Sequence, residues 1–278
     1  MEPCRPTRRD VLATGLAAAA FLAAPALARA PAPTRGIGGP AFGTRWAVTL
    51  RPEADAPALH AVIEDRLGRI DGLMSPWRRD SAISDFNARR SVDWQPADRG
   101  VVAVARAALA LREASGGAFD PAVGPLVGRW GFGPIAAEAP PAEAVFAVSD
   151  EALRKAHPGL TLDLCGIAKG YALDQVVRAL EHRGERDFVV DLGGEIAARG
   201  RHPDGRAWRV AIEDPRPGHA GAVEIVALGA RAIATSGDKV NGYTLGARRY
   251  SHIIDPATAA PVDGAAASVS VIADTAML

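Results

Sequence analysis

The segment that decides the architecture is Leu162-Asp163-Leu164-Cys165-Gly166-Ile167-Ala168-Lys169-Gly170-Tyr171-Ala172-Leu173-Asp174. An apolar, β-prone stretch enters a loop bracketed by Gly166 and Gly170, and apolar residues at helical spacing follow directly. Glycines let the backbone approach a ligand closely, and a helix N-terminus offers free N–H groups to phosphate. The pattern predicts a strand, a ligand-binding loop and a helix. It matches neither a Rossmann nor a P-loop spacing, and a structural salt bridge between Asp163 and Lys169 is the alternative interpretation.

The N-terminal 30 residues have the pattern of an export signal. Arg8 and Arg9 precede an Ala- and Leu-rich run, and small-x-small cleavage sites follow. We expect a twin-arginine signal peptide over residues 1–30 and a periplasmic mature protein. A Sec signal and a membrane anchor are the alternatives, although Pro25 interrupts the short run. Residues 31–41 are expected to form a flexible leader.

Composition and charge narrow the class of protein. The chain has 278 residues, 48% of them hydrophobic and 23% charged, which is typical of one large or two small globular domains. Without residues 1–30 it carries 28 basic and 30 acidic residues, a balance that argues against a nucleic-acid partner. Cys165 is then the only cysteine, so no intramolecular disulfide is expected. It is either a nucleophile beside Asp163 or, as the absence of a nearby His favours, a small buried residue.

Hydrophobic periodicity predicts an α+β fold with many antiparallel strands. Helices are expected over residues 56–74 and 98–115 and after the central motif. Strands are expected over residues 45–50, 188–200 with a kink at Gly193-Gly194, 208–212, 223–227, 230–235 and 249–254. Residues 117–127 contain two prolines and are expected to form a rigid irregular turn. Residues 134–147 are interpreted as a surface insertion. Runs of helices and strands in this order favour α+β over a doubly wound sheet.

Several loops place polar residues beside glycines, and each of them alone is typical of an ordinary turn. In order, they are Trp77 to Ser81, Gly117 to Leu126, Asp163 to Tyr171, Thr235-Ser236-Gly237-Asp238 and Ser251-His252-Ile253-Ile254-Asp255-Pro256. Together they resemble the ApbE family of FAD:protein FMN transferases over residues 42–278. The resemblance implies a layered sheet with helices of the T-fold type. It also implies that a Thr hydroxyl of an acceptor protein attacks the FMN-side phosphorus of FAD, so that AMP leaves.

The resemblance assigns a role to individual positions. The implied FAD contacts are Phe42, Trp77, Ala118, Phe119, Asp120, Asp163, Lys169 and, through its backbone, Ile254. Phe42 stands where the family has Met, and Trp77 stands where it has Tyr. An indole keeps a flat face for the isoalloxazine ring but lacks the phenol oxygen, so a hydrogen bond from that oxygen is not expected here.

His252 matches the family's general base, since an imidazole with a near-neutral pKa can accept the Thr proton. The alternative is a His that fixes its own loop. Asp238 would either orient His252 or cap its turn, and capping is the favoured interpretation. The resemblance further implies an exported or membrane-bound acceptor flavoprotein with an Asp-x-x-Ser/Thr-x-Ala-Thr type of motif.

Magnesium is the remaining implied cofactor. The Gly166 carbonyl matches one Mg²⁺ ligand, while the side-chain ligands of the family, an Asp and a Thr on a C-terminal helix, would lie beyond Leu278. The expectation is therefore a C-terminally incomplete domain. Two rival functions remain open: a Mg²⁺-dependent FAD pyrophosphatase, and a non-catalytic periplasmic FAD-binding protein.

Overall fold

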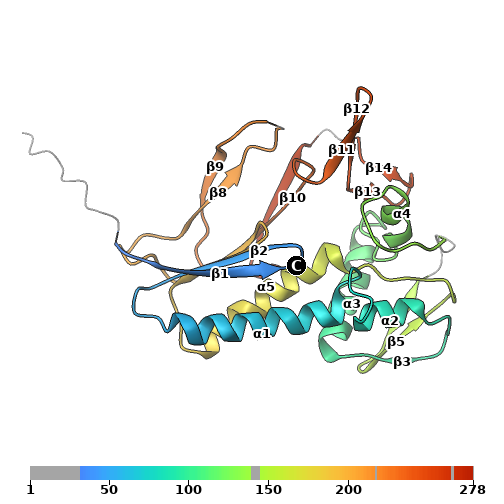
Figure 1. Cartoon of the computed structure of the whole chain (residues 1–278), viewed down its shortest axis with the longest axis horizontal. Coiled ribbons are helices and arrows are strands. Elements are labelled where there is room, and N and C mark those ends of the chain that lie inside the picture. Colours follow the sequence, from blue (N-terminus) through green and yellow to red (C-terminus); the bar gives the residue numbers. More distant parts are fainter. Residues whose placement is uncertain (1–31, 139–144, 217, 264–265, 278) are drawn as a thin grey trace, which may run out of the picture. The chain divides into compact units, whose positions relative to one another are not determined.

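The computed structural model describes residues 32–138, 145–216, 218–263 and 266–277 (Figure 1). The predicted signal peptide, residues 1–30, lies outside the described residues. Residues 33–278 make up one compact unit. Within the described part of the chain, no helix combines the length and the apolar character needed to span a bilayer.

The fold is α+β, as predicted. Its helices are α1 (Ala56–Met74), α2 (Ala82–Ala88), α3 (Arg99–Ala114), α4 (Gly124–Arg129) and α5 (Cys165–His182). Its strands are β1 (Arg35–Ala41), β2 (Thr44–Leu50), β3 (Gln95–Pro96), β4 (Phe146–Val148), β5 (Ala152–Lys155), β6 (Phe188–Leu192), β7 (Glu195–Arg199), β8 (Arg209–Glu213), β9 (Ala222–Ala227), β10 (Ala232–Gly237), β11 (Gly242–Leu245), β12 (Arg248–Ser251), β13 (Ile254–Asp255), β14 (Ala260–Pro261) and β15 (Ser268–Ala273).

The main sheet is antiparallel throughout and has the strand order β1-β2-β6-β7-β10-β15. Its two faces meet different partners. On one face, Val190, Ala197 and Ala232 join the large core formed with α1, α3 and α5. On the other face, Ala198 and Ile233 pack with residues of the β8–β9 region in a smaller core. Figure 1 shows the helices on one side of the sheet and the β8–β9 hairpin on the other.

The expected flexible leader is wrong, because residues 35–41 form the edge strand β1. Every residue of β1 pairs with β2, from Arg35 opposite Leu50 to Ala41 opposite Thr44. Its glycines lower strand propensity, which hid the strand from sequence reasoning. Two of these glycines are needed for close packing: a Cβ at Gly38 would lie 2.6 Å from the Trp46 carbonyl oxygen, and one at Gly39 would lie 2.5 Å from Glu64 Oε1.

The central motif is helical earlier than predicted, because α5 already begins at Cys165. Gly166, Lys169 and Gly170 therefore lie in its first turns and not in a loop. Gly170 is required by the C-terminal segment: a Cβ there would overlap the carbonyl of Ala276. Asp174, one turn further along α5, accepts hydrogen bonds from the backbone N–H of Ala276 at 2.8 Å and of Met277 at 3.1 Å.

Two further expectations change in detail. The segment 117–127 is irregular only in part, since Pro125 stands in the first turn of the short helix α4. The proposed insertion at 134–147 ends in a strand, because Phe146–Val148 pairs with β5. Residues 139–144 of that insertion lie outside the described residues.

Candidate active site

The start of α5 is held in place by a side chain from α2. Asn87 Nδ2 donates to the Leu162 carbonyl at 2.8 Å, and Leu162 N–H donates to Asn87 Oδ1 at 2.7 Å. Asp163 N–H donates to the Pro121 carbonyl at 2.7 Å, and the Asp163 carboxylate accepts the Cys165 N–H at 2.9 Å. These four bonds fix the backbone on both sides of Asp163 and direct its carboxylate to the helix start.

The segment containing Ala118, Phe119 and Asp120 lies against this helix start. A Cβ at Gly166 would come within 3.1 Å of the Phe119 ring, so the ring packs directly against the backbone of Gly166. Asp120 accepts from the Nε of Arg112 at 3.3 Å and from Ala122 N–H at 2.8 Å. The structure thus brings the segment of Phe119 next to Asp163 and Gly166, which lie close together in a later part of the sequence.

Lys169 does not pair with Asp163, so the alternative interpretation of a salt bridge between them is wrong. Its Nζ lies 2.8 Å from Glu195 Oε1, at the start of β7, and the Glu195 side chain is only 14% exposed. A half-buried ion pair of this kind holds the ammonium in a defined position. Sequence reasoning missed Glu195, and nothing in its local sequence indicates the pairing.

His252 is oriented by a backbone carbonyl. Its Nδ1 lies 2.8 Å from the carbonyl oxygen of Asn241. A carbonyl only accepts, so the neutral imidazole carries its proton on Nδ1 and leaves the Nε2 lone pair free. Burial lowers the pKa of His252, the positive charge of Lys169 lowers it further, and the Asn241 bond and Asp238 act in the opposite direction. The ring is therefore neutral and able to accept a proton at neutral pH.

Asp238 is not hydrogen-bonded to His252. Its carboxylate lies 3.9 Å from Arg249 Nε, and the Arg249 guanidinium also donates to the carbonyls of Asp238 and Lys239. The imidazole is oriented instead by the backbone carbonyl of Asn241. The carboxylate acts on His252 only through its charge, which favours the protonated ring.

Comparisons with known proteins identify the family of this chain. The profile of the ApbE family matches residues 42–278. This chain belongs to the ApbE family. The FAD:protein FMN transferase of Klebsiella pneumoniae (strain 342) is 35% identical over 260 residues, which is 87% of this chain and 74% of that protein. That of Vibrio cholerae is 35% identical over 263 residues, or 89% and 79% of the two chains.

Solved ApbE structures have the same fold. The flavin transferase ApbE from Vibrio cholerae superposes with a TM-score of 0.77 at 35% identity, over 88% of this chain and 84% of that one. The apo form of the Pseudomonas stutzeri flavinyl transferase ApbE gives a TM-score of 0.76 at 32% identity, over 90% and 82%. The layered α+β architecture is therefore that of the family.

The other predicted flavin contacts of this ApbE chain lie in three different places. Phe42 forms the β1–β2 turn with φ 51° and is partly buried against the large core. Trp77 lies between α1 and α2 and is 65% exposed, while Ile254 is buried in β13. Their roles stay predictions.

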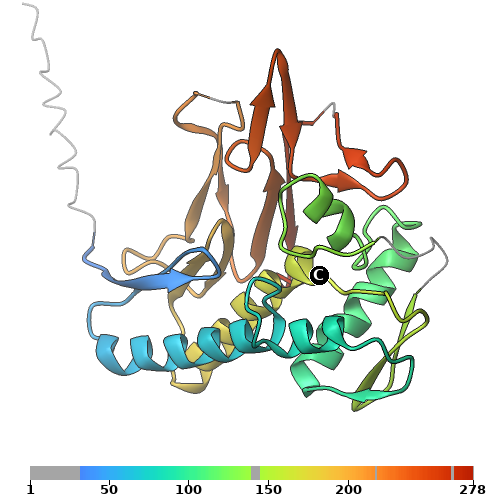
Figure 2. The same cartoon turned by 45° about the vertical axis from the view of Figure 1, so that its right-hand side comes forward.

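Sequence reasoning missed an aromatic cluster beside His252. The rings of Phe132 and Tyr243 stack at 5.1 Å, and those of Tyr243 and Tyr250 at 5.3 Å. The ring of His252 lies edge-on to Phe132 at 6.3 Å. Trp130 stacks on Tyr250 and donates to the Ala259 carbonyl at 3.0 Å, which ties the end of α4 to the β13–β14 hairpin (Figure 2). The sequence Trp-Gly-Phe-Gly at 130–133 was the one local pattern from which this aromatic cluster could have been suspected.

Cys165 is exposed, so the expectation of a buried cysteine is wrong. Desolvation by the atoms packed around the sulfur, followed by the charge of Asp163, raises the pKa of the thiol. The nucleophilic form is the thiolate, and these surroundings disfavour it. The geometry gives no support to a catalytic thiol.

The described residues do not by themselves fit a magnesium site. They contain no group of three or more His, Cys, Asp and Glu side chains placed to hold a metal ion. The carbonyl of Gly166 belongs to the first turn of α5, and one such oxygen is far from the near-octahedral set that Mg²⁺ prefers.

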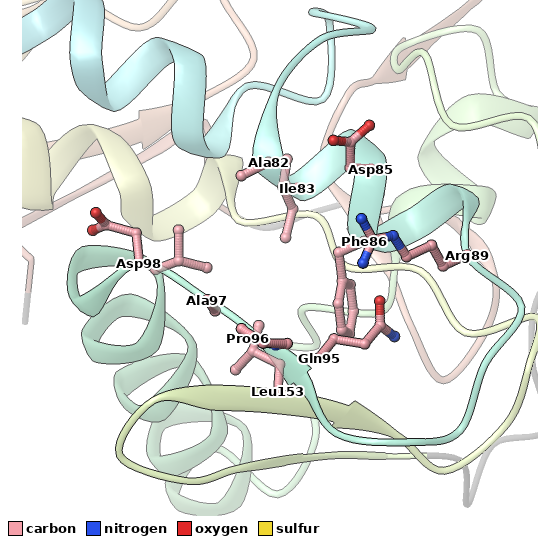
Figure 3. Close-up of a pocket in the computed structure, with 11 residues that line it drawn as sticks. Ala82, Ile83, Asp85, Phe86, Arg89, Gln95, Pro96, Ala97, Asp98 and Leu153 are labelled. Carbon is pink, nitrogen blue, oxygen red and sulfur yellow. The ribbon is translucent and has the colours of Figure 1, made fainter.

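A separate cavity lies between α2, β3 and α3 and includes none of the predicted site residues (Figure 3). Its volume is about 130 Å³, and its walls include Ile83, Phe86 and Leu153. Gln95 also lines it, is only 7% exposed, and has both amide atoms buried without a hydrogen-bond partner. A buried amide without hydrogen-bond partners carries an unfavourable desolvation cost.

Proposed function

We propose that this protein is a FAD:protein FMN transferase that moves the FMN moiety of FAD to a Thr hydroxyl of an acceptor protein and releases AMP. In this reaction the Thr oxygen forms a bond to the FMN-side phosphorus, and the bond from that phosphorus to the bridging oxygen breaks. The Thr proton goes to the enzyme, and the electron pair of the broken bond leaves with AMP. The relatives from Klebsiella pneumoniae and Vibrio cholerae are FAD:protein FMN transferases, which supports this reaction class.

One observation carries the proposal: the Nδ1 of His252 lies 2.8 Å from the Asn241 carbonyl oxygen, which leaves Nε2 as the proton-accepting atom of the ring. Phosphoryl transfer depends mainly on positioning and on neutralising phosphate charge, with little covalent help from the protein. We assign proton acceptance to His252 Nε2 and phosphate contact to Lys169, which Glu195 holds in place. Asp163 and Asp120 are assigned to polar groups of the flavin nucleotide.

The flat parts of FAD require apolar surfaces. We assign the isoalloxazine ring to Trp77, whose indole is exposed and therefore available for stacking. Phe42, Ala118, Phe119 and Ile254 are the remaining proposed contacts, in agreement with the family resemblance.

Magnesium dependence, periplasmic location and the acceptor class remain proposals that rest on the resemblance and on the N-terminal sequence. The described residues do not by themselves form a metal site. Comparing transfer rates with added Mg²⁺ and with chelator tests its requirement. Replacing Arg8 and Arg9 together with Lys, followed by fractionation of the cells, tests export through the twin-arginine route.

Mass spectrometry of an acceptor peptide incubated with the protein and FAD tests the main proposal. We expect a mass gain of one FMN and release of AMP. Free AMP without modification of the acceptor would indicate a pyrophosphatase, and bound FAD with neither product would indicate a carrier; either result contradicts the proposal.

A matched pair of variants tests the base. In His252→Asn the side-chain amide can still donate to the Asn241 carbonyl, but no group accepts the Thr proton. We expect the transfer rate to fall by roughly 100-fold or more with FAD affinity retained. His182→Asn, at an exposed position near the end of α5, is the control and keeps the wild-type rate. Equal rates for all three proteins would refute the role of His252.

A further inference from the structure

A second pocket lies between α1, α3 and α5, and none of the proposed transfer residues lines it. Its volume is about 200 Å³. The side chains that matter in its wall are those of Arg66, Arg69, Asp98, Arg99, Tyr171 and Gln175. Three guanidinium groups thus meet one carboxylate, which leaves an excess of positive charge in a concave site.

The single acid of the pocket is already engaged. Asp98 lies 3.0 Å from Arg69 Nη2, and it also caps α3 by accepting the Gly100 N–H at 2.7 Å. Among the residues that the structure describes, Arg66 and Arg99 have no hydrogen-bond or ion-pair partner. The Nε of Arg66 is moreover fully buried without an acceptor. A buried donor without an acceptor carries an unfavourable desolvation cost, which a bound anion would remove.

The pocket is distinct from the proposed flavin site. Tyr171 and Gln175 are four residues apart and share one side of α5. Lys169 precedes Tyr171 by two residues, so it points about 200° away around the helix axis. A ligand between Tyr171 and Gln175 therefore lies on the opposite side of α5 from the Lys169–Glu195 pair.

The size and chemistry of the pocket specify a small anion. Sites for drug-sized ligands and cofactors commonly measure about 300 to 1,000 Å³, so this pocket is too small for a whole flavin or nucleotide. Arg forks bind phosphate oxygens in pairs, and Tyr and Gln side chains supply further donors. A single tetrahedral phosphate group matches this donor set and the excess charge.

We propose that the α1–α3–α5 pocket binds one phosphate group, either of a small phosphate compound in solution or of an anionic phospholipid headgroup. Arg66 and Arg99 are the main ligands, since neither has another anion to pair with. Asp98 keeps Arg69 at the rim and prevents it from closing the pocket.

Calorimetric titration of the full chain with inorganic phosphate, against chloride at equal ionic strength, tests the proposal. We expect one saturable phosphate site per chain. In Arg66→Gln/Arg99→Gln the affinity is expected to fall roughly tenfold or more, because two charge-assisted contacts are lost. Arg209→Gln on the exposed strand β8 is the matched control and keeps the wild-type affinity. Arg66→Lys is expected to be intermediate, since it keeps the charge but loses the fork.

Thermal unfolding separates loss of binding from loss of folding. Phosphate is expected to raise the Tm of the wild type and of Arg209→Gln but not that of the double variant, whose Tm without phosphate is unchanged. Vesicles of phosphatidylglycerol, compared with phosphatidylcholine, distinguish a headgroup from a soluble compound. No saturable binding, or equal phosphate affinity in the double variant and the control, would overturn the proposal. Because phosphate in the flavin site would be unaffected by Arg66 and Arg99, the result does not depend on the transferase reaction.

Discussion

Replacing Gly170 by Ala tests how the C-terminal segment is attached to α5. In an isolated helix this change is favourable by about 1 kcal/mol, because Gly has the larger conformational entropy to lose. Here the added methyl would overlap the carbonyl of Ala276. That atom belongs to the backbone, so the clash can be relieved only by moving the segment away from the helix.

The size of the effect follows from the contacts that such a movement breaks. Asp174 accepts two hydrogen bonds from this segment, at 2.8 Å from Ala276 N–H and at 3.1 Å from Met277 N–H. Hydrogen bonds to a charged group contribute about 1.5 to 3 kcal/mol each, and Asp174 is buried, so water cannot fully replace them. Loss of one bond, offset by the helix-propensity gain, gives a net destabilisation of about 0.5 to 2 kcal/mol.

Urea unfolding monitored by circular dichroism measures this difference, with Gly68→Ala as the matched control. Gly68 lies within α1, and a Cβ there meets nothing within 4 Å, so its replacement is expected to stabilise the protein by about 0.5 to 1 kcal/mol. The two Gly→Ala changes are thus expected to have opposite signs. A Gly170→Ala protein as stable as Gly68→Ala would show that the segment is not packed against α5 as described.

Three further changes test the surroundings of the site. Burial and then the charge of Arg90 lower the pKa of Lys155 to about 8, so between about pH 8 and 10.5 the unfolded chain holds this proton more tightly than the folded protein does. The free energy of unfolding of the wild type is therefore expected to rise with pH across that window, by up to about 3 kcal/mol relative to Lys155→Met. Parallel pH profiles of the urea midpoints of the two proteins would refute the pKa shift. Gln95→Leu is expected to raise the free energy of unfolding by about 1 to 2 kcal/mol by removing a buried unpaired amide; a decrease would show that bound water satisfies it. Asn87→Leu leaves both backbone polar groups of buried Leu162 unpaired and is expected to cost about 2 to 4 kcal/mol and to weaken FAD binding, whereas unchanged urea and FAD titrations would contradict the clamp.

The parts of the fold that follow local rules were predictable from the sequence. Helix α1 begins and ends at the residues expected from its apolar spacing, and Asp55 caps it. The kink expected at Gly193-Gly194 is the turn of the β6–β7 hairpin, where both φ angles are positive. Strand β1 was missed because Gly38 and Gly39 are required by close contacts with Trp46 and Glu64 on other elements. Local sequence patterns give no information about such distant neighbours.

In the candidate site, too, the reactive groups were predictable from the sequence, whereas the residues that position them were not. The sequence identified His252 and Lys169 by residue type and motif, but their chemical state depends on groups that a motif does not contain. A backbone carbonyl selects the tautomer of His252, and every residue type has a carbonyl, so Asn241 leaves no signal in the sequence. Lys169 is placed by Glu195, 26 residues away on the next strand but one. Reactivity at this site therefore depends on contacts between elements, which is why His252→Asn and a change of Glu195 test the mechanism more sharply than a change of the motif glycines.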